Sequence, residues 1–139
     1  MYVLDTNVLS ELRKVPSGKA NKNVAAWAQT IDADDLFISC ITILELELGV
    51  LSRLRKDAEQ GSMLRAWLDH QVLPEFAERT LPVSTVVTLT CARLHVPNPR
   101  SQRDALIAAT ALAHGMIVVT RNVMDFESTG VGLVNPWGN

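Results

Sequence analysis

The chain has 139 residues, of which 47% are apolar, and its 15 acids against 13 lysines and arginines give a net charge of −2. This length fits one domain, residues 1–139, that buries roughly two-thirds of its unfolded surface. The composition excludes a disordered chain, and the charge balance excludes a protein that coats nucleic acid through overall basicity.

The cysteines and the apolar runs indicate the cellular compartment in which the protein is expected. Cys40 and Cys91 lie in apolar surroundings without metal-ligand spacing, so we expect small core residues of a reducing compartment. Asp5 comes too early for a secretory leader, and no apolar run is long enough to cross a bilayer. We therefore expect a cytoplasmic protein without a membrane partner.

Short apolar runs alternate with segments of helical periodicity along the chain. The pattern predicts a strand at Tyr2–Leu4 and a short helix over residues 8–14. A helix over 24–31 and a second strand at Leu36–Ser39 are expected to follow. Helices over 43–54 and 63–76, with a charged break at 57–61, precede a third strand at 80–83 and a helix over 86–94. After a proline-containing loop at 95–100, a helix over 105–114 ends at Gly115, and strands follow at Ile117–Val119 and Leu133–Val134.

Short apolar strands separated by helices are typical of a parallel sheet covered on both faces. The predicted fold class is therefore α/β, in the form of a three-layer α/β/α sandwich. The helix over 43–54 carries apolar side chains around most of its circumference, so it is either the deepest core element or part of a subunit interface.

Four acids follow predicted strands. Asp5 comes directly after the first strand, Glu45 lies in the first turn of the helix after the second, and Asp125 follows the fourth, while Asp104 opens the helix after the proline loop. Because ligands of open parallel sheets bind beyond the carboxyl ends of the strands, we expect these acids to converge at one edge.

Helix capping is the simpler interpretation for any one of these acids. Thr42-x-x-Glu45 and Ser101-x-x-Asp104 both fit the capping-box pattern, and Asp5 can cap the helix after it. As a group they favour a different role, because carboxylates gathered at one edge repel each other unless a cation lies between them. Glu47 lies on another side of its helix from Glu45 and is not expected to share the site.

Oxygen ligands without cysteine or a histidine pair select Mg²⁺ or Mn²⁺ over zinc. His70, His95 and His114 lack metal-ligand spacing and are expected at the surface or at helix ends. The sequence also lacks a phosphate-binding P-loop, a dinucleotide-binding glycine motif, a serine-hydrolase elbow, the second acid of an aspartyl-phosphate phosphatase and the late lysine of a phospho-receiver.

Four segments in order are Leu4-Asp5-Thr6-Asn7, Thr42-x-x-Glu45-Leu46-x-x-Gly49, Asp104-x-x-Ile107-Ala108-Ala109-Thr110-Ala111 and Val118-Val119-Thr120-Arg121-Asn122-x-x-Asp125-Phe126. They resemble the PIN-domain family, and within it the VapC-like and FitB-like toxins of bacterial type II toxin–antitoxin systems. The resemblance runs from Tyr2 to Asn135-Pro136-Trp137, which is essentially the whole chain.

The resemblance implies a Mg²⁺- or Mn²⁺-dependent endoribonuclease. By matching position it implies Asp5, Glu45 and Asp104 as metal ligands, with Asp125 in a supporting catalytic role. Some relatives carry an acid where this chain has Asn122, so either residue could complete the site.

The same resemblance implies that the hydroxyls of Thr6 and Thr120 orient the carboxylates. Arg100, Arg103 and Arg121 belong to a basic stretch, residues 93–121, that holds four arginines against one acid. They are candidates for contacts with RNA phosphates, although solvated surface arginines explain the charge equally well.

The resemblance further implies three partners: an RNA substrate, a second copy of the chain in a homodimer, and an antitoxin that wraps a tail over the active-site groove in a hetero-oligomer. The alternative is a catalytically weak PIN module that binds RNA or a partner protein without cleaving RNA.

Overall fold

A computed structural model describes residues 1–138. Its centre is one parallel sheet with the strand order β3-β2-β1-β4-β5. The strands are β1 (Tyr2–Leu4), β2 (Leu36–Ser39), β3 (Thr80–Leu81), β4 (Ile117–Val119) and β5 (Leu133–Val134). The predicted α/β fold with a central parallel sheet is confirmed, as are the bounds of all strands except the third, which ends two residues early.

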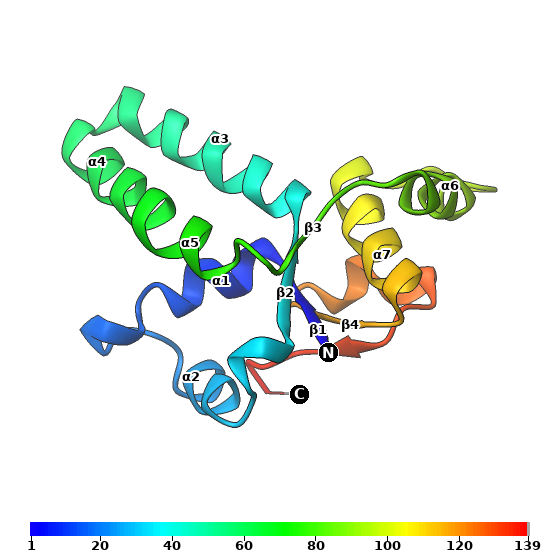
Figure 1. Cartoon of the computed structure of the whole chain (residues 1–139), viewed down its shortest axis with the longest axis horizontal. Helices are drawn as coiled ribbons and strands as arrows, with labels where there is room; N and C mark the ends of the chain where they lie inside the picture. Colours follow the sequence, from blue (N-terminus) through cyan, green and yellow to red (C-terminus); the bar gives the residue numbers. More distant parts are fainter. Residues whose placement is uncertain (139) are drawn as a thin grey trace.

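Helices cover both faces of this sheet (Figure 1). They are α1 (Thr6–Leu12), α2 (Lys22–Gln29), α3 (Cys40–Lys56), α4 (Ala58–Trp67), α5 (Leu73–Glu75), α6 (Thr85–Leu94) and α7 (Gln102–His114). In Figure 1, α1, α3, α4 and α5 lie on one side of the sheet, and α6 and α7 lie on the other. No helix among residues 1–138 combines the length and the apolar character needed to span a bilayer.

The alternation of side chains along the strands divides the core between the two faces. Leu4 and Val119 point into the cluster beneath α1, α3 and α4, whereas their neighbours Val3 and Val118 point into the cluster beneath α7. All four side chains are fully buried. A strand buried on both faces reads as a continuous apolar run, which is why these strands were recognisable in the sequence.

Several helices begin earlier than the apolar periodicity predicts. The structure starts α1, α2, α6 and α7 one to three residues before the predicted positions, and each start follows a polar capping residue: Asp5, Asn21, Ser84 or Ser101. The first turn of these helices is stabilised by the cap and not by apolar burial, so the periodicity does not mark it. Gly115 ends α7 with a φ of 65°, as predicted.

The predicted break at 57–61 and the single helix over 63–76 are both wrong. Only Asp57 interrupts the helices: it ends α3, and its side chain accepts the backbone N–H of Gln60 at 3.1 Å to begin α4. Gly61 lies inside α4, where an added Cβ would come within 2.6 Å of the Leu54 backbone, so its small size permits the close approach of α3 and α4. Residues Leu68–Val72 then form a π-helical turn before α5.

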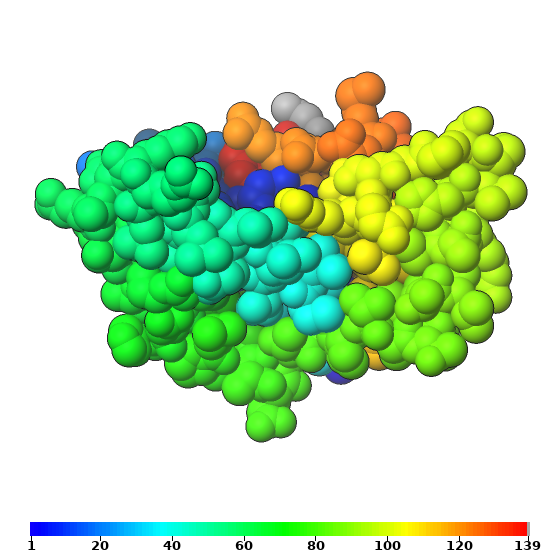
Figure 2. All heavy atoms as spheres, turned by 90° about the horizontal axis from the view of Figure 1, so that it is seen from above, coloured from blue at the N-terminus to red at the C-terminus, as the bar shows by residue number. Residues whose placement is uncertain are grey.

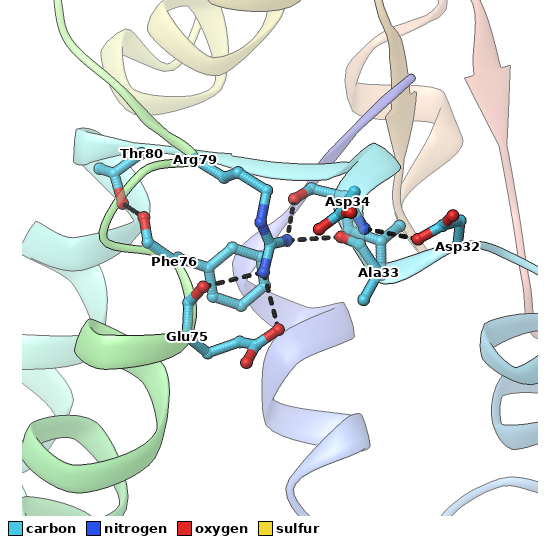
Figure 3. Close-up of polar contacts among 8 residues, drawn as sticks. Asp32, Ala33, Asp34, Glu75, Phe76, Arg79 and Thr80 are labelled. Atoms are coloured by element: carbon cyan, nitrogen blue, oxygen red, sulfur yellow. Dashed lines mark hydrogen bonds and ion pairs between the residues drawn. The ribbon is translucent and has the colours of Figure 1, made fainter.

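Arg79 ties the segment before β3 to the turn before β2 (Figure 3). Its guanidinium donates to the backbone carbonyl of Ala33 at 2.6 Å, to that of Leu36, and to that of Glu75 at 2.8 Å. It also pairs with the Glu75 carboxylate at 2.7 Å and lies 4.7 Å from the centre of the Phe76 ring. Only a planar fork of several donors can reach carbonyls on two separate segments. Arginine has such a fork and lysine does not.

Substitution of Arg79 by methionine is therefore expected to lower the free energy of unfolding by about 2 kcal/mol, because three backbone carbonyls lose their donor. Arg79→Lys is expected to recover less than about half of that loss. Glu75→Gln is the matched control: it removes only an ion pair whose acid is 57% exposed, and we expect a loss below about 0.5 kcal/mol. Urea denaturation of the variants measures these differences, and equal stability of Arg79→Met and wild type would contradict the role of Arg79.

Candidate active site

The four acids come from segments that meet at the carboxyl edge of the sheet. Asp5 follows β1, and Thr120 follows β4, which pairs with β1 through Leu4 and Val119. Glu45 lies on α3, which follows β2, and Asp104 lies in the first turn of α7. Figure 2, which looks at this edge, shows the N-terminal segment (blue) framed by α3 (cyan to teal), α7 (yellow) and the C-terminal segment (orange to red).

Asp5 is held rigidly in place and is only 6% exposed. The Thr120 hydroxyl donates to its Oδ2 at 2.8 Å, and the Asn7 amide donates to the same oxygen at 3.3 Å. The backbone N–H of Thr6 donates to Oδ1 at 2.8 Å, so Asp5 also caps α1. Asp5 therefore both caps α1 and belongs to the acid cluster.

Glu45 has a different role from the capping box considered for it. It is the sixth residue of α3 and lies beyond its first turn, and the cap of that helix is Ser39. Its Oε1 accepts the Thr6 hydroxyl at 2.7 Å, and its Oε2 lies 3.8 Å from the guanidinium of Arg103. The capping interpretation is wrong for Glu45, whose side chain reaches across to the segment that carries Asp5.

Asp104 is the third residue of α7, and its backbone N–H donates to the capping hydroxyl of Ser101 at 3.4 Å. Burial raises the pKa of its carboxyl to about 6, and the nearby charges of Asp5, Asp125 and Glu45 contribute to the rise. Burial and the neighbouring negative charges thus disfavour the charged form of this carboxyl.

Burial also raises the pKa of Asp5, against the effect of its hydrogen bonds from Thr120 and Thr6. Glu45 and Asp125 add to this rise through their negative charge. The acids of the cluster therefore lie within electrostatic reach of one another, as expected for carboxylates gathered at one edge of a sheet.

Asp125 and Asn122 are placed differently around this cluster. Asp125 is exposed at the end of a 3₁₀ turn, Val123–Asp125, and borders a separate hollow beside the main pocket. Asn122 lines the main pocket, and its backbone N–H donates to the Thr120 hydroxyl at 3.0 Å. Thr120 therefore connects the Asn122 backbone to the Asp5 carboxylate.

A pocket of about 440 Å³ surrounds Asp5, Glu45 and Asp104. Its wall includes side chains that the motif analysis did not place in the site: Asn7, Ser10, Glu11, Lys14 and Trp137. Lys14 pairs with Glu11 at 3.3 Å, while the backbone N–H of Asn21 is the main cause of the lowered pKa of Glu11. Four of them lie on α1 or just after it, while Trp137 lies more than 100 positions further along the chain. Asn7 and Trp137 fall within the family-like segments, but no sequence pattern gave either side chain a role in the site.

The three candidate arginines occupy different places. Arg121 lines the pocket, and Arg103 is next to Glu45. Arg100 is engaged elsewhere: its guanidinium donates to the carbonyl of Leu94 at 2.8 Å and to the Ser128 hydroxyl at 2.7 Å. Glu47, as expected, does not face the site and forms a two-point ion pair with Arg65 on α4.

The oxygen donors at the site are of the kind that bind a divalent cation. Among residues 1–138, the present side-chain positions bring no three Asp, Glu, His or Cys groups close enough together to hold one metal ion. The Glu45 carboxylate is instead engaged by Thr6 and Arg103. The chemistry fits nevertheless, because the donors are carboxylate oxygens whose mutual repulsion a hard cation would relieve.

Comparison with known proteins supports the assignment of a family. The family model described as the PIN domain matches residues 2–131. The chain is 36% identical over 142 residues to the VapC ribonuclease Y4jK of Sinorhizobium fredii, covering 99% of this chain and 98% of that protein. It is also 36% identical to the toxin FitB of Neisseria gonorrhoeae, with 99% of both chains covered.

Among solved structures, the crystal structure of FitAcB from Neisseria gonorrhoeae matches with a TM-score of 0.87 and 34% identity over 99% of both chains. The match thus includes the segments that carry Asp5, Glu45 and Asp104 as well as the sheet. The chain belongs to the PIN-domain family, where it is similar to the VapC and FitB toxins.

Proposed function

We propose that the protein is a metal-dependent endoribonuclease that acts as the toxin of a toxin–antitoxin pair. The observation that carries this proposal is the cluster of Asp5, Glu45 and Asp104 at the carboxyl edge of the sheet, where burial and mutual repulsion raise the pKa of two of the acids. A relative named as a ribonuclease and another named as a toxin support the same conclusion.

In this proposal Asp5, Glu45 and Asp104 hold Mg²⁺ or Mn²⁺. Such an ion, when bound, polarises a phosphodiester and lowers the pKa of an attacking water. The chain's own residues orient these ligands. The Thr120 hydroxyl donates to one oxygen of Asp5 at 2.8 Å, and the Thr6 hydroxyl donates to one oxygen of Glu45 at 2.7 Å.

Asp125 supplies negative charge near Asp5 and Asp104 and has a supporting role, and Asn122 holds the Thr120 hydroxyl through its backbone N–H. Arg121 and Arg103 are the better candidates for phosphate contacts, since both lie at the cluster. Arg100 is the weaker candidate, because its guanidinium already donates to Leu94 and Ser128.

An apolar groove supports the proposed antitoxin partner. About 240 Å³ in volume, it is lined mainly by apolar side chains of α1 and of the segment from α4 to α5, including Leu9, Leu12, Trp67, Val72 and Phe76. A smaller hollow of about 220 Å³ shares Trp67 with this groove and Glu45 with the carboxylate pocket. A single extended or helical tail could therefore lie in the groove and reach the acids.

A second surface supports the proposed homodimer. Leu46 and Val50 of α3 are buried, whereas Leu44, Leu48 and Leu51 are 45%, 41% and 48% exposed on another side of the helix. This stripe of leucines has the spacing of one helical face and is available to a second copy of the chain.

The test is cleavage of total bacterial RNA by the purified protein with Mg²⁺, with Mn²⁺ and with EDTA, beside an identically purified Asp5→Asn variant. We expect discrete fragments with 5′-phosphate and 3′-hydroxyl ends only when metal and Asp5 are both present. Equal cleavage by both proteins would indicate a contaminating nuclease. The absence of cleavage by antitoxin-free protein with either metal would favour a PIN module that binds without cleaving.

A further inference from the structure

Arg121 and Trp137 form a pair on the wall of the carboxylate pocket. The guanidinium carbon of Arg121 lies 5.4 Å from the centre of the Trp137 ring, and both residues line the pocket. Among residues 1–138, no carboxylate forms an ion pair with Arg121, although the same pocket is lined by four acids. The other base on the wall, Lys14, is paired with Glu11.

Trp137 is fixed from several sides. Its ring packs against the core cluster beneath α1 and α3, and its backbone N–H donates to the Asn135 side chain at 3.0 Å. Its backbone carbonyl accepts the Asn23 amide of α2 at 3.0 Å. The indole is therefore a rigid support for the guanidinium, to which it contributes a cation–π attraction.

Arg121 is also tied to the acid cluster through its backbone. Its N–H donates to the Asn7 side chain at 3.3 Å, and the Asn7 amide donates to Asp5 at 3.3 Å. One amide side chain thus spans the distance between the base of Arg121 and the first carboxylate. The backbone of Arg121 is thereby fixed relative to Asp5, while its guanidinium lies over the Trp137 ring at the pocket wall.

An acidic pocket repels an RNA backbone, so a substrate strand needs a cationic contact beside the acids. A guanidinium held on an aromatic ring is suited to this contact, because it offers fixed donors to a phosphate and a plane on which a base can stack. The pocket, about 440 Å³ in volume, falls in the size range of small-ligand sites, and stacking on the guanidinium requires an unpaired base.

Building on the proposed nuclease function, we infer that Arg121 and Trp137 form a nucleotide subsite for unpaired RNA. In this subsite Arg121 binds the phosphate next to the scissile one, and Trp137 is the positioning residue that holds Arg121 there. The C-terminal turn that carries Trp137 thereby becomes part of substrate binding.

The test is binding of a labelled, unpaired RNA oligonucleotide in Mg²⁺, followed by fluorescence anisotropy over a series of salt concentrations. All proteins carry Asp104→Asn, so that no strand is cut during the measurement. Arg121→Met is expected to raise Kd about 10-fold and to reduce the slope of log Kd against log salt by about 0.7, the loss of one phosphate contact of a single strand. Trp137→Leu is expected to raise Kd about 5-fold and to reduce the slope in part, and Trp137→Phe to stay within about 2-fold of the parent.

Arg93→Met is the matched control, because it removes an exposed arginine from α6, outside the pocket lining. We expect it to leave Kd and salt slope unchanged. The retained ring in Trp137→Phe separates the proposed contact from damage to the core, since a purely structural role would not change the salt slope. The inference is overturned if Arg121→Met and Trp137→Leu both match Arg93→Met in Kd and in slope.

The two proposals fail separately. If wild type cuts RNA but Arg121→Met and Trp137→Leu retain its KM and salt dependence, the subsite is wrong and the nuclease stands. If wild type cuts nothing while both variants weaken strand binding, the subsite stands and the enzyme assignment falls.

Discussion

Asp104→Asn is expected to lower the rate of RNA cleavage by at least about 1,000-fold while making the protein more stable in EDTA. The activity falls because the variant loses a proposed metal ligand. The stability rises because the carboxyl of Asp104 has a pKa of about 6, raised first by burial and then by the charges of Asp5, Asp125 and Glu45. A neutral amide removes this repulsion, and the backbone hydrogen bond from residue 104 to Ser101 is independent of the side chain.

Single-turnover cleavage and thermal denaturation at about pH 7.5 test both parts together, with an expected rise in Tm of about 3–6 °C. The matched control is Asp34→Asn, which makes the same chemical change at an exposed position remote from the acid cluster. It is expected to change neither quantity. An Asp104→Asn protein that is inactive but less stable than wild type would mean that Asp104 supports the fold and not a charged site.

The stability of the protein in EDTA is expected to fall as the pH rises from about 4 to about 7, and divalent metal is expected to reverse the loss. An unfolded aspartate has a pKa of about 3.9, whereas burial and repulsion raise the pKa of Asp104 to about 6 in the fold. The folded state therefore binds the proton more tightly, so the stability gained from protonation is lost as the pH rises through the window between these two values. The loss is about 1–2 kcal/mol after allowance for solvent screening.

A pH series of thermal denaturation with EDTA, Mg²⁺ and Mn²⁺ measures this dependence. Metal binding should raise Tm at about pH 7.5 and much less at about pH 5, because protons compete with the ion for the same oxygens. The difference between wild type and Asp104→Asn isolates this residue from other titrating groups. A difference that does not vary with pH would refute the assignment of the raised pKa to Asp104.

The sequence by itself determined the sheet and the place of Asp5 at its carboxyl edge. β1, β2 and β4 are buried on both faces, so each appears as an apolar run, interrupted only by Ser39 at the end of β2. A parallel sheet presents the carboxyl ends of its strands at one edge, and Asp5 follows such an end directly. Both features depend on neighbours along the chain, which a sequence displays.

Helix limits were decided partly by local contacts that the apolar pattern does not record. Asp57 both ends α3 and begins α4, and Gly61 allows the two helices to approach closely enough to form a hairpin. A glycine and a charged residue between two apolar segments are typical of a loop, and only the packing of Gly61 against Leu54 shows that the helix continues through it.

The finer structure of the site was decided by tertiary contacts alone. Glu45 is oriented by Thr6, 39 positions away, where its own sequence neighbours favoured a helix cap. Arg121 lies on Trp137 because β4 and the C-terminal turn are brought to the same edge of the sheet, whereas Arg100 is directed to Leu94 and Ser128. Such pairings follow from where the backbone places each side chain, and the sequence names the chemical groups without giving the distances between them.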